Sequence, residues 1–287
     1  GLKPGRATGQ WRDSEDGLGG GRYAYDVNAV FVPAALEAAH RLFASGLLDP
    51  YLGQADRRML GQAAATAQVW RTRAPRLFAT AIPARQARKA IAGYAARIDI
   101  AGDAALTSLD RAPLRFHALS LDAAGKPVPI LHSDEGFALL FGHPDPAALD
   151  QAIKAMMRPF PAGLMTDVGL LVANPAMASP QIQARFGRNA YHGAVIWSWQ
   201  QAVLAAGLDR QLRRTDLPAP IRTRLKAAER TLWAAIARTK AVRTSELWSW
   251  TYRDGRYRVA PFGAASEDAD ESNAAQLWST VFLGVPA

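Results

Sequence analysis

Apolar residues recur at three- and four-residue intervals over long stretches of this chain, which is the period of an amphipathic helix. This pattern predicts helices over residues 27–44, 56–73, 83–98, 135–141, 145–157, 191–213, 221–243 and 273–283. Pro33 lies inside the first helix, where a kink is expected, whereas Pro83 stands at a first turn, where proline is well tolerated. The sequence therefore predicts a mainly α-helical protein.

Two other stretches alternate apolar and polar residues, which is the period of a half-buried strand. Residues 114–121 and 128–132 flank a glycine-containing turn, and residues 247–252 and 256–261 flank Asp254-Gly255. An Asp-Gly pair between two alternating runs is typical of a tight hairpin. We therefore expect two small β-hairpins. The first 25 residues are Gly-rich and irregular, and neither a fixed-period repeat nor a linker divides residues 1–287, which predicts a single domain.

Composition narrows the classes of function. The chain has no cysteine, which excludes disulfides and thiol nucleophiles and leaves cytoplasmic and periplasmic or secreted locations equally open. No apolar run approaches the roughly 18 residues that a membrane span requires. The net charge is +9, but the arginines are scattered along predicted helices, so we expect no nucleic-acid partner. No metal-binding or cofactor motif is present, and we expect neither group.

One acidic side chain stands beside a tryptophan near each end of the chain. Trp11-Arg12-Asp13-Ser14-Glu15-Asp16 lies in the Gly-rich start, where its acids could cap the next helix, bind a cation or donate a proton. Ser245-Glu246-Leu247-Trp248-Ser249-Trp250 would place both tryptophans on the face of Glu246 if it forms a strand. Glu271 is a rival, but its acidic cluster is better explained as a helix cap. Cleavage of a glycosidic bond requires two separated carboxyl groups.

Further candidates lie at two predicted helix starts. Arg22, Asp26 and Asn28 precede or open the first helix, where Asp26 or Asn28 could cap the helix or grip sugar hydroxyls. The glycines of residues 17–21 could allow a ligand to approach the backbone closely. Tyr191, His192 and Trp197 crowd the entrance of another predicted helix, either as a platform for sugar rings or as ordinary core.

Taken in chain order, these segments resemble the inverting glycosidases with an (α/α)6 toroid. The nearest likeness is to amylo-α-1,6-glucosidase, the glucosidase part of glycogen debranching enzymes, with glucoamylase and α-glucosidase I more distant. Their Trp-x-Asp-Ala segment compares with Trp11-Arg12-Asp13-Ser14, their Glu-Ile-Asn-Ala helix with residues 26–29, and their Tyr-His-Asn-Gly-x-Val-Trp-Pro with residues 191–199. Their Ser-Glu-Ile and Ala-Gln-Ala-Trp-Ser segments compare with residues 245–247 and 275–279. Asp26 stands where that family has Glu, and Ser198 follows Trp197 in place of Pro.

The resemblance implies a general acid at Asp13 and a general base at Glu246. A general acid must keep its proton near neutral pH, and burial against Trp11 or the nearby charges of Glu15 and Asp16 would raise the pKa of Asp13. Substrate would be held by Trp11, Arg12, Arg22, Asp26, Asn28, Tyr191, His192, Trp197 and Trp248. The expected fold is an (α/α)6 toroid, or its C-terminal two-thirds. In that family the general acid lies near the middle of the toroid, whereas Asp13 lies near the start of this chain. A missing N-terminal segment or a partner chain would then complete it.

Two other classes of function stay open at this point. One is a carbohydrate-binding or assembly protein that shares the toroid and lacks catalysis. The other is a toroid phosphorylase, lyase or epimerase, of which a phosphorylase would show phosphate-dependent activity. The carbohydrate itself, its linkage and the compartment are left undetermined by the sequence.

Overall fold

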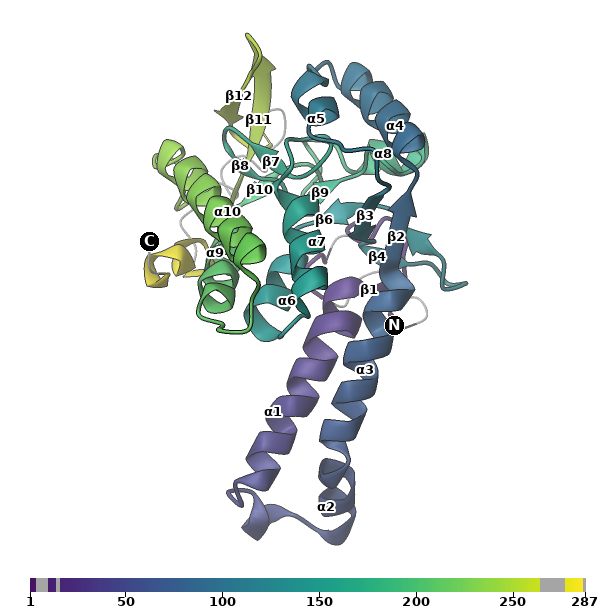
Figure 1. Cartoon of the computed structure of the whole chain (residues 1–287), viewed down its shortest axis with the longest axis vertical. Coiled ribbons are helices and arrows are strands. Elements are labelled where there is room, and N and C mark those ends of the chain that lie inside the picture. The colour runs from purple at the N-terminus through teal and green to yellow at the C-terminus, as the bar shows by residue number, and fades with distance from the viewer. Residues whose placement is uncertain (4–9, 14–15, 264–276, 286–287) are drawn as a thin grey trace.

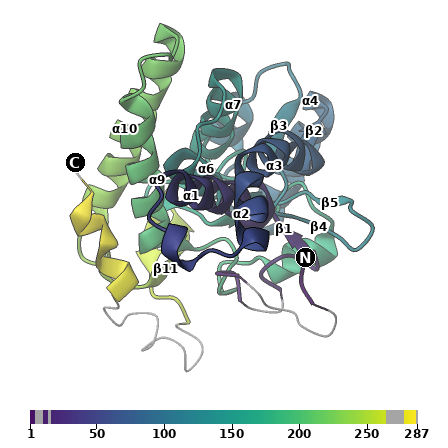
Figure 2. The ribbon, with the colours of Figure 1, turned by 90° about the horizontal axis from the view of Figure 1, so that it is seen from below.

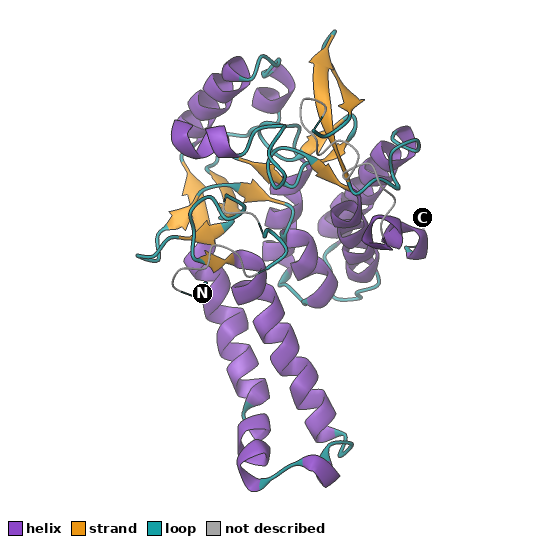
Figure 3. Ribbon diagram, turned by 180° about the vertical axis from the view of Figure 1, so that it is seen from behind, coloured by secondary structure: helices purple, strands orange, loops and turns teal. Residues whose placement is uncertain are grey.

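The computed structural model describes residues 1–3, 10–13, 16–263 and 277–285. Within these ranges the protein is mainly helical and carries several small antiparallel sheets. Figure 1 shows a globular body from which a long pair of antiparallel helices, α1 and α3, projects as an arm. Figure 3 shows that the strands all lie in the body and that the arm consists of helices joined by loops. The mainly α expectation is confirmed.

The helices of the described residues belong to three kinds: α-helices, one π-helix and two 3-10 helices. The arm and its base contain η1 (Asp26–Phe31, π), α1 (Val32–Ala44), η2 (Asp49–Tyr51, 3-10), α2 (Gln54–Gly61) and α3 (Ala63–Phe78). The body contains α4 (Ala84–Arg97), α5 (Asp103–Thr107), α6 (Glu135–Phe141), α7 (Pro146–Met157), α8 (Pro180–Arg185), α9 (Ser198–Leu212), α10 (Ala219–Arg238) and η3 (Leu277–Gly284, 3-10). None of the helices in the described ranges is long and apolar enough to cross a bilayer.

The strands pair into short antiparallel sheets that join distant parts of the chain. Two three-stranded sheets have the orders β1-β4-β5 (Tyr23–Ala24, Ser120–Leu121, Pro127–Val128) and β10-β11-β12 (Ile196–Trp197, Leu247–Arg253, Arg256–Ala260). Three pairs complete the set: β2-β3 (Ala79–Ile82, Leu114–His117), β6-β9 (Leu131–His132, Ala173–Asn174) and β7-β8 (Met165–Thr166, Gly169–Leu170). Strand β6, just before α6, is held by β9, and strand β10, just before α9, is held by β11.

Helices α6 and α9 pack tightly at the centre of the body. Leu139 on α6 and Leu204 and Leu208 on α9 are completely buried in the main core. A Cβ atom at Gly207 would lie 2.8 Å from the Leu139 Cβ, so only glycine allows this approach of the two helices. Seen from below in Figure 2, η3 lies along the side of α9 and α10, so the described C-terminal segment returns to the body.

Most of the predicted helices are confirmed, but one helix and one hairpin differ from the prediction. The helix expected over 191–213 begins only at Ser198, because Ile196 and Trp197 pair with Trp248 and Leu247 instead. The first hairpin is only partly right, since β4 pairs with β5 as expected but β3 pairs with β2. The second hairpin is confirmed, and Asp254 and Gly255 both have positive φ, at 53° and 73°. Residues 273–276 of the last helix lie outside the described residues.

Candidate functional site

Three helices begin close together at the centre of the body, and the N-terminal segment crosses them. Helix η1 begins at Asp26, α6 follows Asp134, and α9 follows Trp197. The Arg12 side chain donates to Asp134, at the start of α6, and to the carbonyl of His192, in the loop that precedes α9. Helix N-termini carry partial positive charge, which favours carboxylates and hydroxyl oxygens nearby.

Arg12 is a buried structural link and not an open sugar contact. Its guanidinium makes two hydrogen bonds to the Asp134 carboxylate, Nε to Oδ2 at 3.1 Å and Nη2 to Oδ1 at 2.8 Å. It also donates to the Val172 carbonyl at 2.8 Å and lies 4.2 Å from the Trp11 ring centroid. The residue is 1% exposed. All of these donors are used inside the protein, so the expected hydroxyl contact of Arg12 is replaced by a role in positioning Trp11 and Asp13.

Aromatic rings form a cluster around Trp11. The Trp11 ring makes edge-to-face contacts with His192, Trp197 and Trp199 at centroid distances of 5.3, 5.8 and 5.1 Å. His192 stacks on Trp197 with an interplanar angle of 8°, and Tyr191 packs edge-on against both. The structure therefore brings Trp11 against a distant segment of the chain that contains Tyr191, His192 and Trp197.

Asp13 lies at the edge of this aromatic cluster. Its Oδ1 is 3.6 Å from His192 Nε2, and its side chain is 70% exposed. Burial, and then the positive charge of Arg12, lower the pKa of His192 to about 3, so the imidazole is neutral near pH 7. The contact is thus one between a carboxyl and a neutral ring. The burial that the sequence argument expected for Asp13 is absent.

Glu246 contacts Tyr191, the neighbour of His192 in the chain, and is almost fully buried. Its Oε1 accepts hydrogen bonds from Tyr191 Oη at 3.1 Å and from Trp278 Nε1 at 3.0 Å, and the residue is 3% exposed. Its backbone carbonyl accepts from the Ser198 amide at 3.1 Å, which ties it to the start of α9. Asp13 and Glu246 therefore contact two adjacent residues, His192 and Tyr191.

Asp26 is the least satisfied charged group at the three helix starts. It is 1% exposed, and neither carboxylate oxygen has a hydrogen-bond partner within the described ranges. Burial, and then the negative charge of Asp134, raise the pKa of Asp26 to about 7. A buried carboxyl with no donors pays a desolvation cost when it ionises, and this cost depends on pH.

The substitution Asp26→Asn is expected to stabilise the protein progressively as the pH rises from about 4 to about 7. The native pKa of about 7 exceeds the reference of 3.8, so wild-type stability from this group is full below about pH 4 and is lost as the pH rises through 7. A pKa difference of this size corresponds to about 4 kcal/mol. Urea denaturation of both proteins at several pH values measures the difference in unfolding free energy.

His192 changes the unfolding free energy in the opposite direction with pH. Because the pKa of His192 is lowered in the folded state, its contribution to stability is lost as the pH falls from 6.5 towards 3. This contribution is present in both proteins and cancels in the difference. A difference in unfolding free energy that stays constant from pH 4 to pH 8 would contradict the assignment of Asp26 as the responsible group.

The remaining predicted residues make hydrogen bonds to backbone carbonyls away from the aromatic cluster. Arg22 donates to the Leu2 carbonyl at 2.6 Å, and Asn28 donates to the Ala24 carbonyl one turn earlier at 2.7 Å. Trp248 is 1% exposed in the main core, where its indole donates to the Val168 carbonyl at 3.0 Å. The expected sharing of a face by Glu246 and Trp248 does not bring this ring into the aromatic cluster around Trp11. A Cβ at Gly21 would lie 2.0 Å from Ser120 Oγ, so that glycine serves packing.

Several features of the site were not expected from the sequence. The Trp11 indole nitrogen and both amide atoms of Gln10 are buried without hydrogen-bond partners among the described residues. Asp134 and Glu135, at the start of α6, hold Arg12 and His117 respectively. The only sequence signal was an acidic pair at a helix start, which is common for reasons of capping alone. Glu15 and Glu271 lie outside the described residues.

No family model matches the chain, and no curated protein is significantly similar to it. Within the described ranges, no group of three or more His, Asp or Glu side chains is placed to hold a metal ion. The geometry of the site offers one exposed and one buried carboxyl beside a cluster of aromatic rings, with unpaired polar groups at Gln10 and Trp11.

Proposed function

We propose that this protein is a glycoside hydrolase that inverts the anomeric carbon, with Asp13 as general acid and Glu246 as general base. The observation that carries the proposal is the contact of these two carboxyls with the adjacent residues His192 and Tyr191. Residues from opposite ends of the chain thus reach one aromatic-lined place. Two carboxyl groups flanking a sugar ring, at a spacing that admits a water molecule, are the requirement of this reaction.

The acid side of the proposed site is accessible to substrate. Asp13 would protonate the departing glycosidic oxygen, and its exposed side chain can reach a ligand without rearrangement of the core. Sugar C–H faces stack on aromatic rings, and the half-buried rings of Trp11 and Tyr191 would supply that surface, with the buried Trp197 packed against both.

The base side of the proposed site is held rigidly. Glu246 would remove a proton from the water that attacks the anomeric carbon on the face opposite the departing oxygen. The Tyr191 hydroxyl and the Trp278 indole both donate to its Oε1, which fixes the orientation of the carboxylate. Trp278 belongs to η3, so the C-terminal segment helps to position the base.

The proposed architecture is part of an (α/α)6 toroid. Support comes from helix α6, which packs against both η1 and α9 and has the Arg12–Asp134 pair at its start. Further support comes from large apolar side chains that stay exposed along the α1–α3 arm: Leu42, Leu47, Tyr51, Met59, Val69 and Leu77. Such a surface is typical of one covered by another chain segment or partner.

Anomeric analysis of the products tests the proposal. The chain is incubated with a panel of α- and β-linked oligosaccharides, and the anomeric protons of the first product are followed by NMR before mutarotation. We expect a product whose anomeric configuration is opposite to that of the substrate. A product that keeps the configuration of the substrate would overturn the acid–base assignment, and phosphate-dependent release of a sugar phosphate would indicate a phosphorylase instead.

The exposure of Asp13 favours one second candidate, a carbohydrate-binding protein without catalysis. An exposed carboxyl lacks the apolar surroundings that keep many general acids protonated. This candidate predicts that an oligosaccharide from the panel binds by calorimetry and is recovered uncleaved.

A further inference from the structure

A cavity lies away from Asp13 and Glu246, between the base of the arm and the body. Its volume is about 480 Å³, within the usual range of small-molecule sites, and it runs between η1, α1 and α3 on one side and α6 and α7 on the other. It follows α6 from Glu135 to Phe141, so its length is roughly 10 Å at 1.5 Å per helical residue. Neither proposed catalytic residue lines it.

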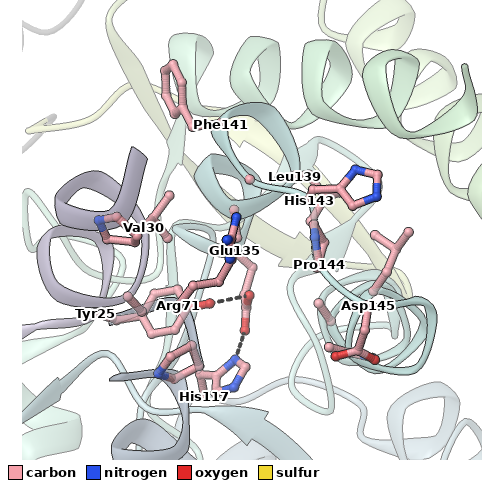
Figure 4. Close-up of a pocket in the computed structure, with 18 of the residues that line it drawn as sticks. Tyr25, Val30, Arg71, His117, Glu135, Leu139, Phe141, His143, Pro144 and Asp145 are labelled. Atoms are coloured by element: carbon pink, nitrogen blue, oxygen red, sulfur yellow. Dashed lines mark hydrogen bonds and ion pairs between the residues drawn. The ribbon is translucent and has the colours of Figure 1, made fainter. Parts of the chain in front are cut away.

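The floor of this cavity is a hydrogen-bonded group of three side chains, shown in Figure 4. Glu135 Oε2 accepts from Tyr25 Oη at 2.7 Å, and Glu135 Oε1 lies 2.5 Å from His117 Nδ1. The Tyr25 and His117 rings stack at a centroid distance of 5.1 Å. These residues come from three separate segments of the chain, and together they form a floor whose carboxylate is already occupied on both oxygens.

His117 is the part of the floor that can still bind something. Burial alone lowers the pKa of His117, but the charge and hydrogen bond of Glu135 outweigh burial and raise it. Nδ1–H is committed to Glu135, and no hydrogen bond within the described residues engages Nε2. The imidazolium form therefore presents one unused N–H donor.

The other lining residues are apolar walls and a rim of charged groups. The walls include Val30, Pro33, Ala34, Leu139, Phe141, Ala148, Leu149 and Ala152. At the rim, Glu37 pairs with Arg71, and Asp145 Oδ1 caps α7 by accepting from two backbone amides at 3.0 Å each. Arg76 also lines the cavity and has no acidic partner among the described residues. Every acid of the lining is thus engaged, whereas Arg76 and His117 retain donors.

We propose that this cavity binds a small organic carboxylate with an apolar body. The carboxylate accepts hydrogen bonds from His117 Nε2 and from Arg76, and the apolar body lies along α6 between the walls. Burial of the apolar body supplies most of the affinity, and the two cations select an anion over a neutral or cationic analogue. This binding site is independent of the proposed hydrolysis, because it shares no residue with Asp13, Glu246 or the aromatic cluster around Trp11.

Isothermal titration calorimetry with matched probes tests the proposal. The probes are octanoate, 1-octanol, octylamine and acetate, added to the full chain at pH 7. We expect octanoate to bind with one site per chain and the alcohol to bind at least about tenfold more weakly, because it lacks the charge-assisted hydrogen bonds. Acetate is expected to bind at least about tenfold more weakly as well, because it lacks the apolar body.

Three variants locate the binding of octanoate. His117→Gln and Arg76→Gln are each expected to weaken octanoate binding by about tenfold and to leave octanol binding unchanged. Arg73→Gln is the matched control, since Arg73 is an exposed arginine on the same helix that does not line the cavity, and it should bind as wild type does. Arg76 is also exposed, so its substitution does not endanger the fold if His117→Gln does.

Three results overturn the proposal. The first is equal affinity for octanoate and octanol, which would show an apolar surface without selectivity for the carboxylate. The second is wild-type affinity for octanoate in Arg76→Gln, and also in His117→Gln where that variant folds. The third is no detectable octanoate binding at concentrations below its aggregation limit. The readout is binding alone, so a failure of the glycosidase assay leaves each of these results interpretable.

Discussion

Replacement of Asp13 by Asn, or of Glu246 by Gln, is expected to lower the rate of glycoside hydrolysis by about 10²- to 10⁴-fold. Each change removes the proton transfer and keeps the size of the side chain. Gln at position 246 retains an amide oxygen that can accept from Tyr191 and Trp278, so the local hydrogen bonds persist. The measurement is the initial rate on the best oligosaccharide of the panel, with melting temperature as the check on folding.

A second substrate separates the two roles. A glycosyl fluoride has a leaving group that needs little protonation, so Asp13→Asn should recover most of its rate on it, whereas Glu246→Gln should not. Asp16→Asn is the matched control, because Asp16 is an exposed acid close to Asp13 in the chain whose carboxylate pairs with Arg185 at 3.2 Å. Its activity should stay within about twofold of wild type, in keeping with a solvated surface pair. Undiminished turnover by either site variant would falsify the acid–base assignment.

Arg12→Leu is expected to destabilise the protein by about 3–5 kcal/mol. The substitution leaves the Asp134 carboxylate buried without its two guanidinium hydrogen bonds, and the Val172 carbonyl loses a donor. Removal of one partner of a buried pair is costly because the other charge remains uncompensated. Urea denaturation monitored by circular dichroism measures the loss.

The double variant Arg12→Leu with Asp134→Leu tests whether the pair itself is responsible. Its loss of unfolding free energy should fall short of the sum of the two single losses by at least about 2 kcal/mol. Arg57→Leu serves as the surface control, because the exposed Arg57–Asp49 pair has the same chemistry and a 2.7 Å contact. It should cost less than about 1 kcal/mol. Equal losses for Arg12→Leu and Arg57→Leu would show that burial of the pair adds nothing.

Local sequence patterns were sufficient for most helices and for one hairpin. Helix α6 begins and ends where its apolar spacing placed it, and Asp254-Gly255 forms the predicted turn. These features depend on neighbours within a few residues, which is the range over which propensity and turn chemistry act. The pairing of β3 with β2 was missed because their partner choice depends on contacts across more than 30 residues.

The candidate site was predictable in part, and for a similar reason. Tryptophans, a histidine and acids in polar loops marked Trp11, His192 and Glu246 as candidates. The partner of Arg12 is Asp134, 122 residues away, and no local pattern indicates such a pair. The exposure of Asp13 and the burial of Asp26 were not predicted either, because burial depends on contacts between distant segments of the chain. Burial is decided by the packing of helices α6 and α9 with η1.

Two dipeptides of this fold serve two sites at once. Tyr25 and Glu135 belong to the floor of the cavity beside α6, whereas their neighbours Asp26 and Asp134 lie with Arg12. Saturation mutagenesis at these four positions therefore yields ambiguous phenotypes when scored by a single assay. A protein engineer who redesigns one of the two sites therefore has to rescreen the other.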